Sequence, residues 1–152
     1  MQPINQLKSD IPVARRDGAK IVVIGDRFMS PAAFEAAIRA RSAGPLEIQT
    51  HELLWPDKPM RHGYATPGLE GLKEYQGEPD EILRWIGDAE IVVTQLAPVS
   101  ASMLKRLPNL KLIAVARGGP VNIDFAAARR HGIHIVNALG RNASAVPNSP
   151  SA

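Results

Sequence analysis

Short apolar runs alternate along the chain with segments in which apolar residues recur every three or four positions. Four of the runs are rich in valine and isoleucine, which is typical of strands buried on both faces. They occupy residues 20–25, 89–94, 110–116 and 133–136, and residues 46–53 alternate apolar and polar positions as an edge strand does. Strands that alternate with helices favour a parallel sheet with helices on both faces. The pattern therefore predicts an α/β domain of three layers, built on about five parallel strands.

The helical segments are bounded by residues that favour helix ends. Side chains that can accept a hydrogen bond from the first turn precede three of them: Ser30, Ser100 and Asp124. The helix after Ser100 is expected to reach Leu107, and another helix is predicted over residues 79–86. Glycines predict helix ends at Gly87 and Gly132.

Two stretches lack a regular period. Residues 1–18 are predicted to be a loose arm. Residues 54–77 carry several prolines and glycines and are predicted to be a long loop. A structureless segment of this length in a compact domain is usually either functional or disordered, and the sequence leaves both open.

The composition is that of an ordinary globular domain and excludes several kinds of site. The 152 residues are 45% hydrophobic and 22% charged, which fits one domain and argues against wholesale disorder. The chain has no cysteine, which excludes disulfides, zinc–thiolate centres and thiol nucleophiles. No apolar run approaches the ~18 residues of a membrane span, and the first residues lack the apolar core of a secretory signal. We therefore expect a cytoplasmic protein without a membrane partner.

The charge is unevenly distributed along the chain. Residues 1–104 carry 11 basic and 14 acidic side chains, whereas residues 105–152 carry seven basic side chains and one acidic side chain, Asp124. The last third could therefore attract anions, although a solvated basic face explains the same pattern. Nucleic acid is not expected as a partner, because only 5% of the residues are aromatic and no nucleic-acid-binding motif is present.

The loop that follows the predicted strand at residues 110–116 is the main candidate for ligand binding. It reads Arg117-Gly118-Gly119-Pro120. Ligands of parallel α/β sheets bind at the carboxyl ends of the strands, and glycines let backbone N–H groups approach an oxyanion closely. The arginine could add a charge-assisted hydrogen bond to a carboxylate or phosphate. A tight turn with a surface arginine explains the same residues, so both interpretations stay open on local evidence.

Other familiar sites are absent from the sequence or poorly supported by it. No G-x-G-x-x-G or G-x-x-x-x-G-K-[ST] motif occurs, so a self-contained dinucleotide or P-loop site is not expected. Asp26 could bind a metal or accept a phosphoryl group, but the accompanying acidic residues are lacking, and an ordinary loop residue is the favoured interpretation. His131 and His134 are separated by a glycine and are predicted to diverge rather than to share a metal. His51 has no evident partner, and Trp85 is expected to pack in the core or at its rim rather than to stack on a ligand.

Residues 89–146 carry a more specific signal. The segments AEIVVT and PVSASMLKRLPNLKLIAVARGG, followed by NIDFAAARRHGIHIVNALGRNASAV, match in order a pattern of the D-isomer-specific 2-hydroxyacid dehydrogenases. The chain resembles the substrate-binding domain of this family, which includes phosphoglycerate dehydrogenase. Residues 20–88 share with it only the order of the elements. Residues 117–122 read RGGPVN and look two residues shorter than the G-x-G-x-D-N turn of many members.

The resemblance implies an enzyme that transfers hydride between a nicotinamide, NAD or NADP, and C2 of a small 2-hydroxy or 2-oxo acid. It implies a flavodoxin-like substrate-binding domain over residues 19–141 and, in the full-length family, a Rossmann domain that binds the cofactor. It also implies that the loop after the fourth strand holds the substrate carboxylate, here through Arg117, Gly118 and Gly119. Full-length members are usually homo-oligomers. The family's glycine-rich fingerprint and its catalytic arginine, glutamate and histidine cannot be assigned to residues of this chain.

The last residues depart from the family pattern. Residues 142–152 are expected to begin the helix that leads into the Rossmann domain, but Pro147 and Pro150 interrupt it. The codons of the segment after Val146 could, with one base inserted and the frame shifted, encode Ala-Glu-Phe-Thr-Val-Gly, as the family pattern leads one to expect. We therefore hypothesise a one-base deletion, in the gene or in its sequencing. It would leave a truncated, inactive fragment that binds no cofactor alone.

Two other functions remain open at this point. One is a non-catalytic α/β module that binds a small carboxylate or a partner protein. The other is a basic anion-binding protein outside the family, which the charge of the last third allows.

Overall fold

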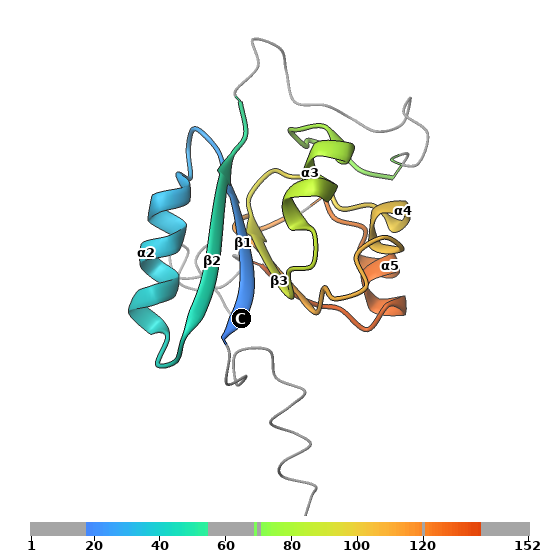
Figure 1. The fold of residues 1–152 in the computed structure, drawn as a ribbon. Coiled ribbons are helices and arrows are strands. Elements are labelled where there is room, and N and C mark those ends of the chain that lie inside the picture. Colours follow the sequence, from blue (N-terminus) through green and yellow to red (C-terminus); the bar gives the residue numbers. More distant parts are fainter. Residues whose placement is uncertain (1–17, 55–68, 70, 120, 138–152) are drawn as a thin grey trace, which may run out of the picture.

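The computed structural model describes residues 18–54, 69, 71–119 and 121–137, whose strands form one parallel sheet (Figure 1). Five strands lie in the order β2-β1-β3-β4-β5. They are β1 (Ala19–Gly25), β2 (Leu46–Glu52), β3 (Ile91–Thr94), β4 (Leu112–Val115) and β5 (His134–Asn137). The helices are α2 (Pro31–Arg41), α3 (Pro79–Ile86), α4 (Ala101–Leu104) and α5 (Phe125–Arg130). The predicted α/β class and its five parallel strands are confirmed.

The strand order reverses beside β1. From β1 the chain moves outward to β2, which lies at the edge as predicted, and then returns across β1 to β3, β4 and β5. All four neighbouring pairs are parallel. The carboxyl ends of the strands therefore meet at one edge of the sheet, and the reversal falls between β1 and β3. In open α/β sheets this edge is where ligands bind.

Helices cover both faces of the sheet, which confirms the predicted three layers. Successive residues of a strand point to opposite faces. Ile21 and Val23 pack with Phe34 of α2, whereas Val22 and Ile24 belong to the core formed with α3, α4 and α5. Figure 1 shows α2 on one side of the sheet and the other three helices on the opposite side. The larger cluster of buried aliphatic side chains lies on the side of α3, α4 and α5.

The predicted N-caps are confirmed. The side-chain oxygens of Ser30, Ser100 and Asp124 each accept a hydrogen bond from the backbone N–H three residues on. The helix end at Gly132 is also confirmed, since its φ of +72° is left-handed. One helix is shorter than expected: α4 ends at Leu104, and Leu107 is buried in the following turn. Pro108 disfavours helical backbone at Leu107, because its ring clashes with the residue before it, so the helix does not extend to Leu107.

Some predictions fall on residues outside the described part of the chain. They concern the arm before Gly18, most of the loop at 54–77, and the helix start expected at 142–152. The end of that long loop, residues 71–77, is described and contacts the sheet edge. Within the described ranges, no helix is long and apolar enough to cross a membrane.

Candidate functional site

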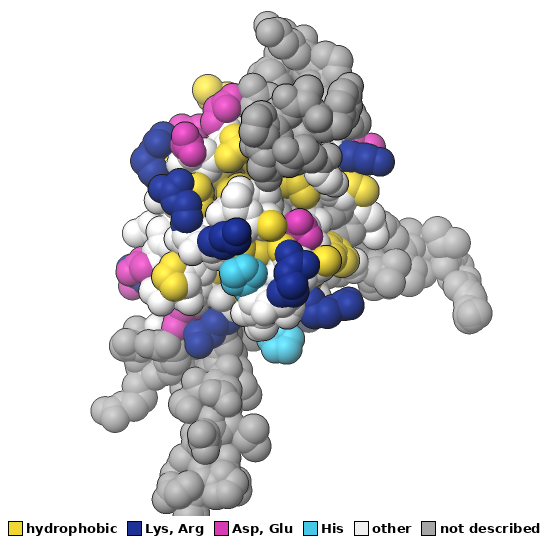
Figure 2. Space-filling view, turned by 90° about the vertical axis from the view of Figure 1, so that its right-hand side faces the viewer, with side chains coloured by type: hydrophobic (Ala, Val, Ile, Leu, Met, Phe, Trp, Pro, Cys, Tyr) yellow, Lys and Arg dark blue, Asp and Glu magenta, His cyan; other side chains and the backbone are white. Residues whose placement is uncertain are grey.

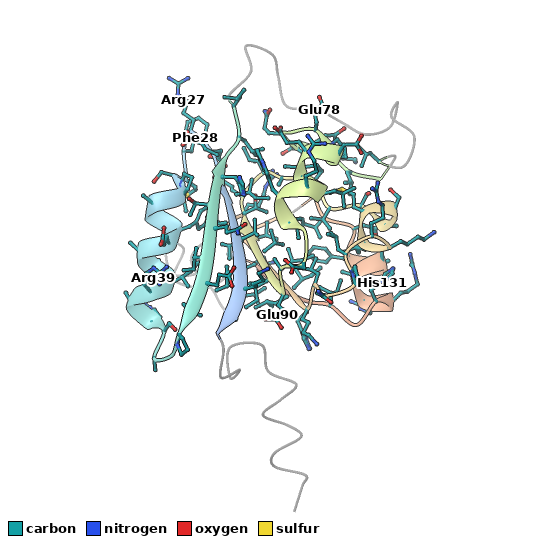
Figure 3. The ribbon with its side chains drawn as sticks, viewed as in Figure 1. Arg27, Phe28, Arg39, Glu78, Glu90 and His131 are labelled. Carbon is teal, nitrogen blue, oxygen red and sulfur yellow. The ribbon has the colours of Figure 1, made fainter. Side chains whose placement is uncertain are left out.

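The carboxyl edge of the sheet is built from the loops after β1, β3 and β4 and from residues 71–77, which return to it before α3. Figure 3 labels Arg27 and Glu78 at this end of the molecule and Glu90 at the opposite end. Backbone hydrogen bonds tie the returning residues to the loops after β3 and β4. Residues from distant parts of the sequence therefore meet at the edge where a ligand is expected.

Asp26 shapes the loop after β1. Its Oδ1 accepts hydrogen bonds from the backbone N–H groups of Phe28 (2.8 Å) and Met29 (3.0 Å), and the residue is almost completely buried. Gly25 has no space for a side chain, because a Cβ there would lie 2.5 Å from the backbone nitrogen of Pro31. Among the described residues, no three His, Cys, Asp or Glu side chains gather around a possible metal. These contacts fit the interpretation of Asp26 as a loop residue.

A buried asparagine joins the loops after β3 and β4. Asn122 is 0% exposed, and its Nδ2 donates to the backbone carbonyls of Ala97 (2.7 Å) and Gln95 (3.3 Å). The backbone N–H of Val99 also donates to the carbonyl of Asn122, at 3.0 Å. Asn122 was not among the predicted site residues, although it opens the NIDFAAARR segment that carries the resemblance.

Arg117 follows β4, and its guanidinium is held by the returning residues. Nη2 lies 2.8 Å from Oε1 of Glu74, and Nη1 donates to the backbone carbonyl of Glu74 (2.9 Å) and to Oδ1 of Asn122 (3.3 Å). Within the pair, the side chain of Arg117 is 16% exposed and that of Glu74 is 47% exposed. Several of the five N–H donors of Arg117 are thus engaged inside the chain. A contact of Arg117 with the carboxylate of a bound ligand stays a prediction.

The two glycines after Arg117 leave backbone groups open. Within the described part of the chain, nothing accepts a hydrogen bond from the N–H of Gly118 or of Gly119. Gly118 is half-buried and Gly119 is exposed, and a Cβ on Gly119 would have no atom within 4 Å. The N–H of Val121 donates to the Gly119 carbonyl at 2.7 Å, which folds the loop back on itself. Unpaired backbone N–H groups of this kind can bind an oxyanion.

The histidines belong to other parts of the structure. His51 of β2 stacks on Trp85 of α3, with ring centroids 4.6 Å apart and planes 11° apart. This contact corrects the expectation that His51 has no partner, while the packing of Trp85 against the core is confirmed. Burial lowers the pKa of His51 below its usual range, and the charge of Glu81 partly opposes the shift. His131 follows the last residue of α5, and His134 begins β5.

Lys and Arg side chains are scattered over the face of the molecule that carries α4 and α5 (Figure 2), and the last third of the chain contains seven basic residues. Five of them are exposed: Lys105, Arg106, Lys111, Arg129 and Arg130. None of these five forms an ion pair with a described acidic side chain. This arrangement fits a solvated basic face, and the attraction of an anion to it stays a prediction.

A known family shares the region that contains this edge. Its sequence profile, described as D-isomer specific 2-hydroxyacid dehydrogenase, catalytic domain, matches residues 67–148, more than half of the chain. The chain belongs to this family. The resemblance found in residues 89–146 is therefore confirmed. The match also takes in Glu74, which the sequence analysis had missed because it lies in the irregular stretch at 54–77.

Curated relatives match this chain over only a part of their own length. The glycerate dehydrogenase of Methylorubrum extorquens is 43% identical over 77 residues, which are 49% of this chain and 24% of that enzyme. The hydroxypyruvate reductase of Thermotoga maritima is 36% identical over 70 residues, which are 45% of this chain and 23% of that enzyme. The matched segments thus span about a quarter of these relatives.

Solved structures of two oxidoreductases are also similar to the chain. The pyruvate reductase of Chlamydomonas reinhardtii is 15% identical with a TM-score of 0.45, over 89% of this chain and 31% of that one. The NAD-dependent formate dehydrogenase from Staphylococcus aureus, solved in complex with NAD, is 18% identical with a TM-score of 0.44, over 78% and 30%.

The described residues of this family member do not fit NAD. In a dinucleotide site, a glycine-rich turn after the first strand lets the pyrophosphate approach a helix N-terminus. Here the backbone of Pro31 fills the space beside Gly25, and the Asp26 carboxylate already accepts the N–H groups of Phe28 and Met29. A carboxylate at this turn also repels a pyrophosphate. No reaction step is therefore assigned to the cofactor in this chain.

Proposed function

We propose that this chain is the substrate-binding part of an NAD(P)-dependent oxidoreductase that acts on the CH–OH group of D-2-hydroxy acids. Its ligand is a small 2-hydroxy or 2-oxo acid, whose carboxylate is held at Arg117, Gly118 and Gly119. Residues 19–141 are the substrate-binding domain, and a Rossmann domain of the full-length enzyme supplies NAD or NADP. The full-length enzyme is a cytoplasmic homo-oligomer in this proposal. Membership in the family supports the reaction class.

One observation carries the assignment of the site. The N–H groups of Gly118 and Gly119, to which no described residue offers an acceptor, follow β4 at the ligand-binding edge of the sheet. A carboxylate can accept two such hydrogen bonds at once, and its charge strengthens each of them. The open space beside Gly119 leaves room for the bound acid. The chain's own residues therefore bind and orient the substrate, and no proton or hydride transfer is assigned to them.

The test uses this chain and oxamate, a stable carboxylate with the shape of a 2-oxo acid. The amide signals of Gly118 and Gly119 are followed by ¹⁵N–¹H NMR during an oxamate titration. We expect saturable shifts at both glycines. Gly119→Val should weaken binding about tenfold, because a branched side chain would fill the open space, and a tenfold loss corresponds to about 1.4 kcal/mol. A titration without saturable shifts in the unmodified chain would refute the site.

The matched control is Gly44→Val. Gly44 also precedes a proline and has no atom within 4 Å of its Cβ position, but it lies between α2 and β2 at the opposite edge of the sheet. This variant should bind oxamate as the unmodified chain does. Equal loss of binding in both variants would show that a general effect of valine, and not the site, explains the result.

A second measurement tests the dehydrogenase class. The gene is sequenced through the codons for residues 145–152 and about 600 bases beyond, the length that encodes one more domain. We expect a reading frame with a G-x-G-x-x-G turn and downstream arginine, glutamate and histidine. A gene without such a frame would favour a non-catalytic module that binds a small carboxylate or a partner protein.

A further inference from the structure

The loop that contains the two glycines is held by residues from a distant part of the chain. Arg117 contacts Glu74, 43 positions earlier, at the carboxylate (2.8 Å) and at the backbone carbonyl (2.9 Å). On the other side of the glycines, the carbonyl of Val121 accepts a hydrogen bond of 3.0 Å from the N–H of Lys73. Residues 73 and 74 therefore hold the loop both before and after the glycines.

The backbone of Glu74 has an unusual conformation that permits these contacts. Its φ is +50°, and no other non-glycine residue in the described ranges has a positive φ. A left-handed conformation is unfavourable for a residue with a Cβ, and such strain persists where surrounding contacts maintain it. On one side of Glu74, Lys73 bonds to the loop after β4. On the other side, the N–H of Gln76 donates to Leu96 in the loop after β3, at 2.9 Å. The turn at Glu74 thus lets one short segment bind both loops.

We infer that Glu74 is a positioning residue for the carboxylate-binding loop. It holds Arg117 in place, and through Arg117 it keeps the N–H groups of Gly118 and Gly119 in the geometry that receives a carboxylate. Arg117 is the link between Glu74 and the glycines. The inference rests on the proposed function, because it takes the glycine N–H groups as the site of the substrate carboxylate.

The sign of the change in anion affinity when the charge of Glu74 is removed distinguishes a positioning role from a simple electrostatic one. By Coulomb's law alone, removing a negative charge near the site should strengthen the binding of an anion. If Glu74 positions the loop, its removal should weaken binding, because the donors lose their fixed orientation. The two effects have opposite signs, so a positioning role is distinguishable from a nearby charge.

The experiment compares the unmodified chain with Glu74→Gln and Glu74→Asn. Asparagine adopts left-handed backbone more readily than glutamate and is one carbon shorter. This variant therefore keeps the turn and the backbone carbonyl at residue 74, and it removes the contact between the carboxylate and Arg117. Oxamate is titrated as above, and ¹⁵N order parameters of Gly118 and Gly119 are measured without ligand. We expect binding about threefold to tenfold weaker in both variants, the effect of losing a partly buried, charge-assisted contact. We also expect lower order parameters at both glycines.

Asp80→Asn is the control for charge. Asp80 is exposed in the first turn of α3, and the substitution removes the same charge from the same end of the molecule. It should change neither the oxamate affinity nor the order parameters. Urea unfolding of each variant checks that it remains folded.

The possible results separate the inference from the proposed function. Unchanged or tighter oxamate binding in Glu74→Gln, or unchanged order parameters at the glycines, would overturn the positioning role. Failure of the proposed function has another signature: oxamate would shift neither glycine signal in the unmodified chain. The order parameters would then still show whether Glu74 holds the loop.

Discussion

An ion pair between distant residues lies at each end of the sheet, and the two pairs differ in their surroundings. At the amino end, Nζ of Lys20 lies 2.7 and 2.9 Å from the carboxylate oxygens of Asp88, and the two side chains are 37% and 66% exposed. At the carboxyl end, Arg117 lies 2.8 Å from Glu74 and is less exposed. Its guanidinium also binds a backbone carbonyl and the buried Asn122.

The two ion pairs have similar distances between their charged atoms, but they play different structural roles. A lysine ammonium is a single charged point on a flexible stem, whereas a guanidinium can bind several partners in fixed directions. Water and salt screen an exposed pair, so it contributes little to stability. An arginine that joins a returning segment to a loop fixes the shape of that loop. The firmly held end is the one at which a binding site needs fixed geometry.

The largest effect is expected for Asn122→Ala. The buried carbonyl of Ala97 and the partly buried carbonyl of Gln95 would lose their side-chain donor. The free energy of unfolding should fall by about 2–3 kcal/mol, as measured by urea denaturation. The control at the amino end is Asn109→Ala, because Asn109 is exposed and its Nδ2 makes only a 3.5 Å contact with the carbonyl of Asp88. Equal losses in the two variants would contradict the difference between the ends.

The next largest effect is the coupling energy within each ion pair. A double-mutant cycle of Glu74→Ala and Arg117→Ala, followed by urea unfolding, should give a coupling of about 1 kcal/mol. The same cycle with Lys20→Ala and Asp88→Ala should give no measurable coupling at about 0.15 M salt, because the pair is exposed and screened. A stronger coupling in the lysine pair than in the arginine pair would show that the amino end of the sheet is held more firmly than the carboxyl end.

The fold was predictable because its signals are local. Runs such as residues 20–25 bury both faces of a strand, and the alternation at 46–53 identifies the edge strand β2. Ser30 and Asp124 act on N–H groups three residues away, so the caps are visible in the sequence. The predicted length of α4 was wrong. The apolar spacing favours a helix as far as Leu107, but the residue before a proline disfavours helical backbone.

The site was predictable only in part. The glycine pair after a buried strand is a local signal, so the loop at Arg117, Gly118 and Gly119 was a candidate from the sequence alone. The residues that hold this loop in place were not predicted, because each contacts partners that are far away in the sequence. Glu74 is 43 positions from Arg117, and Asn122 is 25 and 27 positions from the carbonyls that it binds. Only the sheet order brings these residues together.

A smaller effect is expected from His51, near the carboxyl end of β2. Burial lowers its pKa in the folded chain, so the unfolded chain binds a proton more readily. The contribution of neutral His51 to stability is therefore complete above its usual pKa of 6.5, and it is lost as the pH falls below that value. The melting temperature should fall between about pH 7 and about pH 5. His51→Phe, which keeps a ring stacked on Trp85, should reduce this slope, and an unchanged slope would contradict the assignment.

The smallest effect is expected at the amino end. The hydrogen bond between the two side chains raises the pKa of Lys20 and lowers that of Asp88. The contribution of Asp88 is complete above its usual pKa of 3.8 and is lost as the pH falls through the lowered value. The contribution of Lys20 is complete below 10.5 and is lost as the pH rises through the raised value.

Between those limits the contribution of the pair does not vary with pH. Asp88→Asn should therefore leave the shape of the melting-temperature profile unchanged from about pH 5 to about pH 9. The melting temperature itself should change little, since water screens both groups. The melting temperature of Glu74→Gln, measured alongside, should fall further, because Arg117 is less exposed than Lys20. Equal decreases in the two variants would mean that the amino end is held by its ion pair as firmly as the carboxyl end. A firmly held ion pair would then not distinguish the carboxyl end of the sheet, where the ligand is proposed to bind, from the amino end.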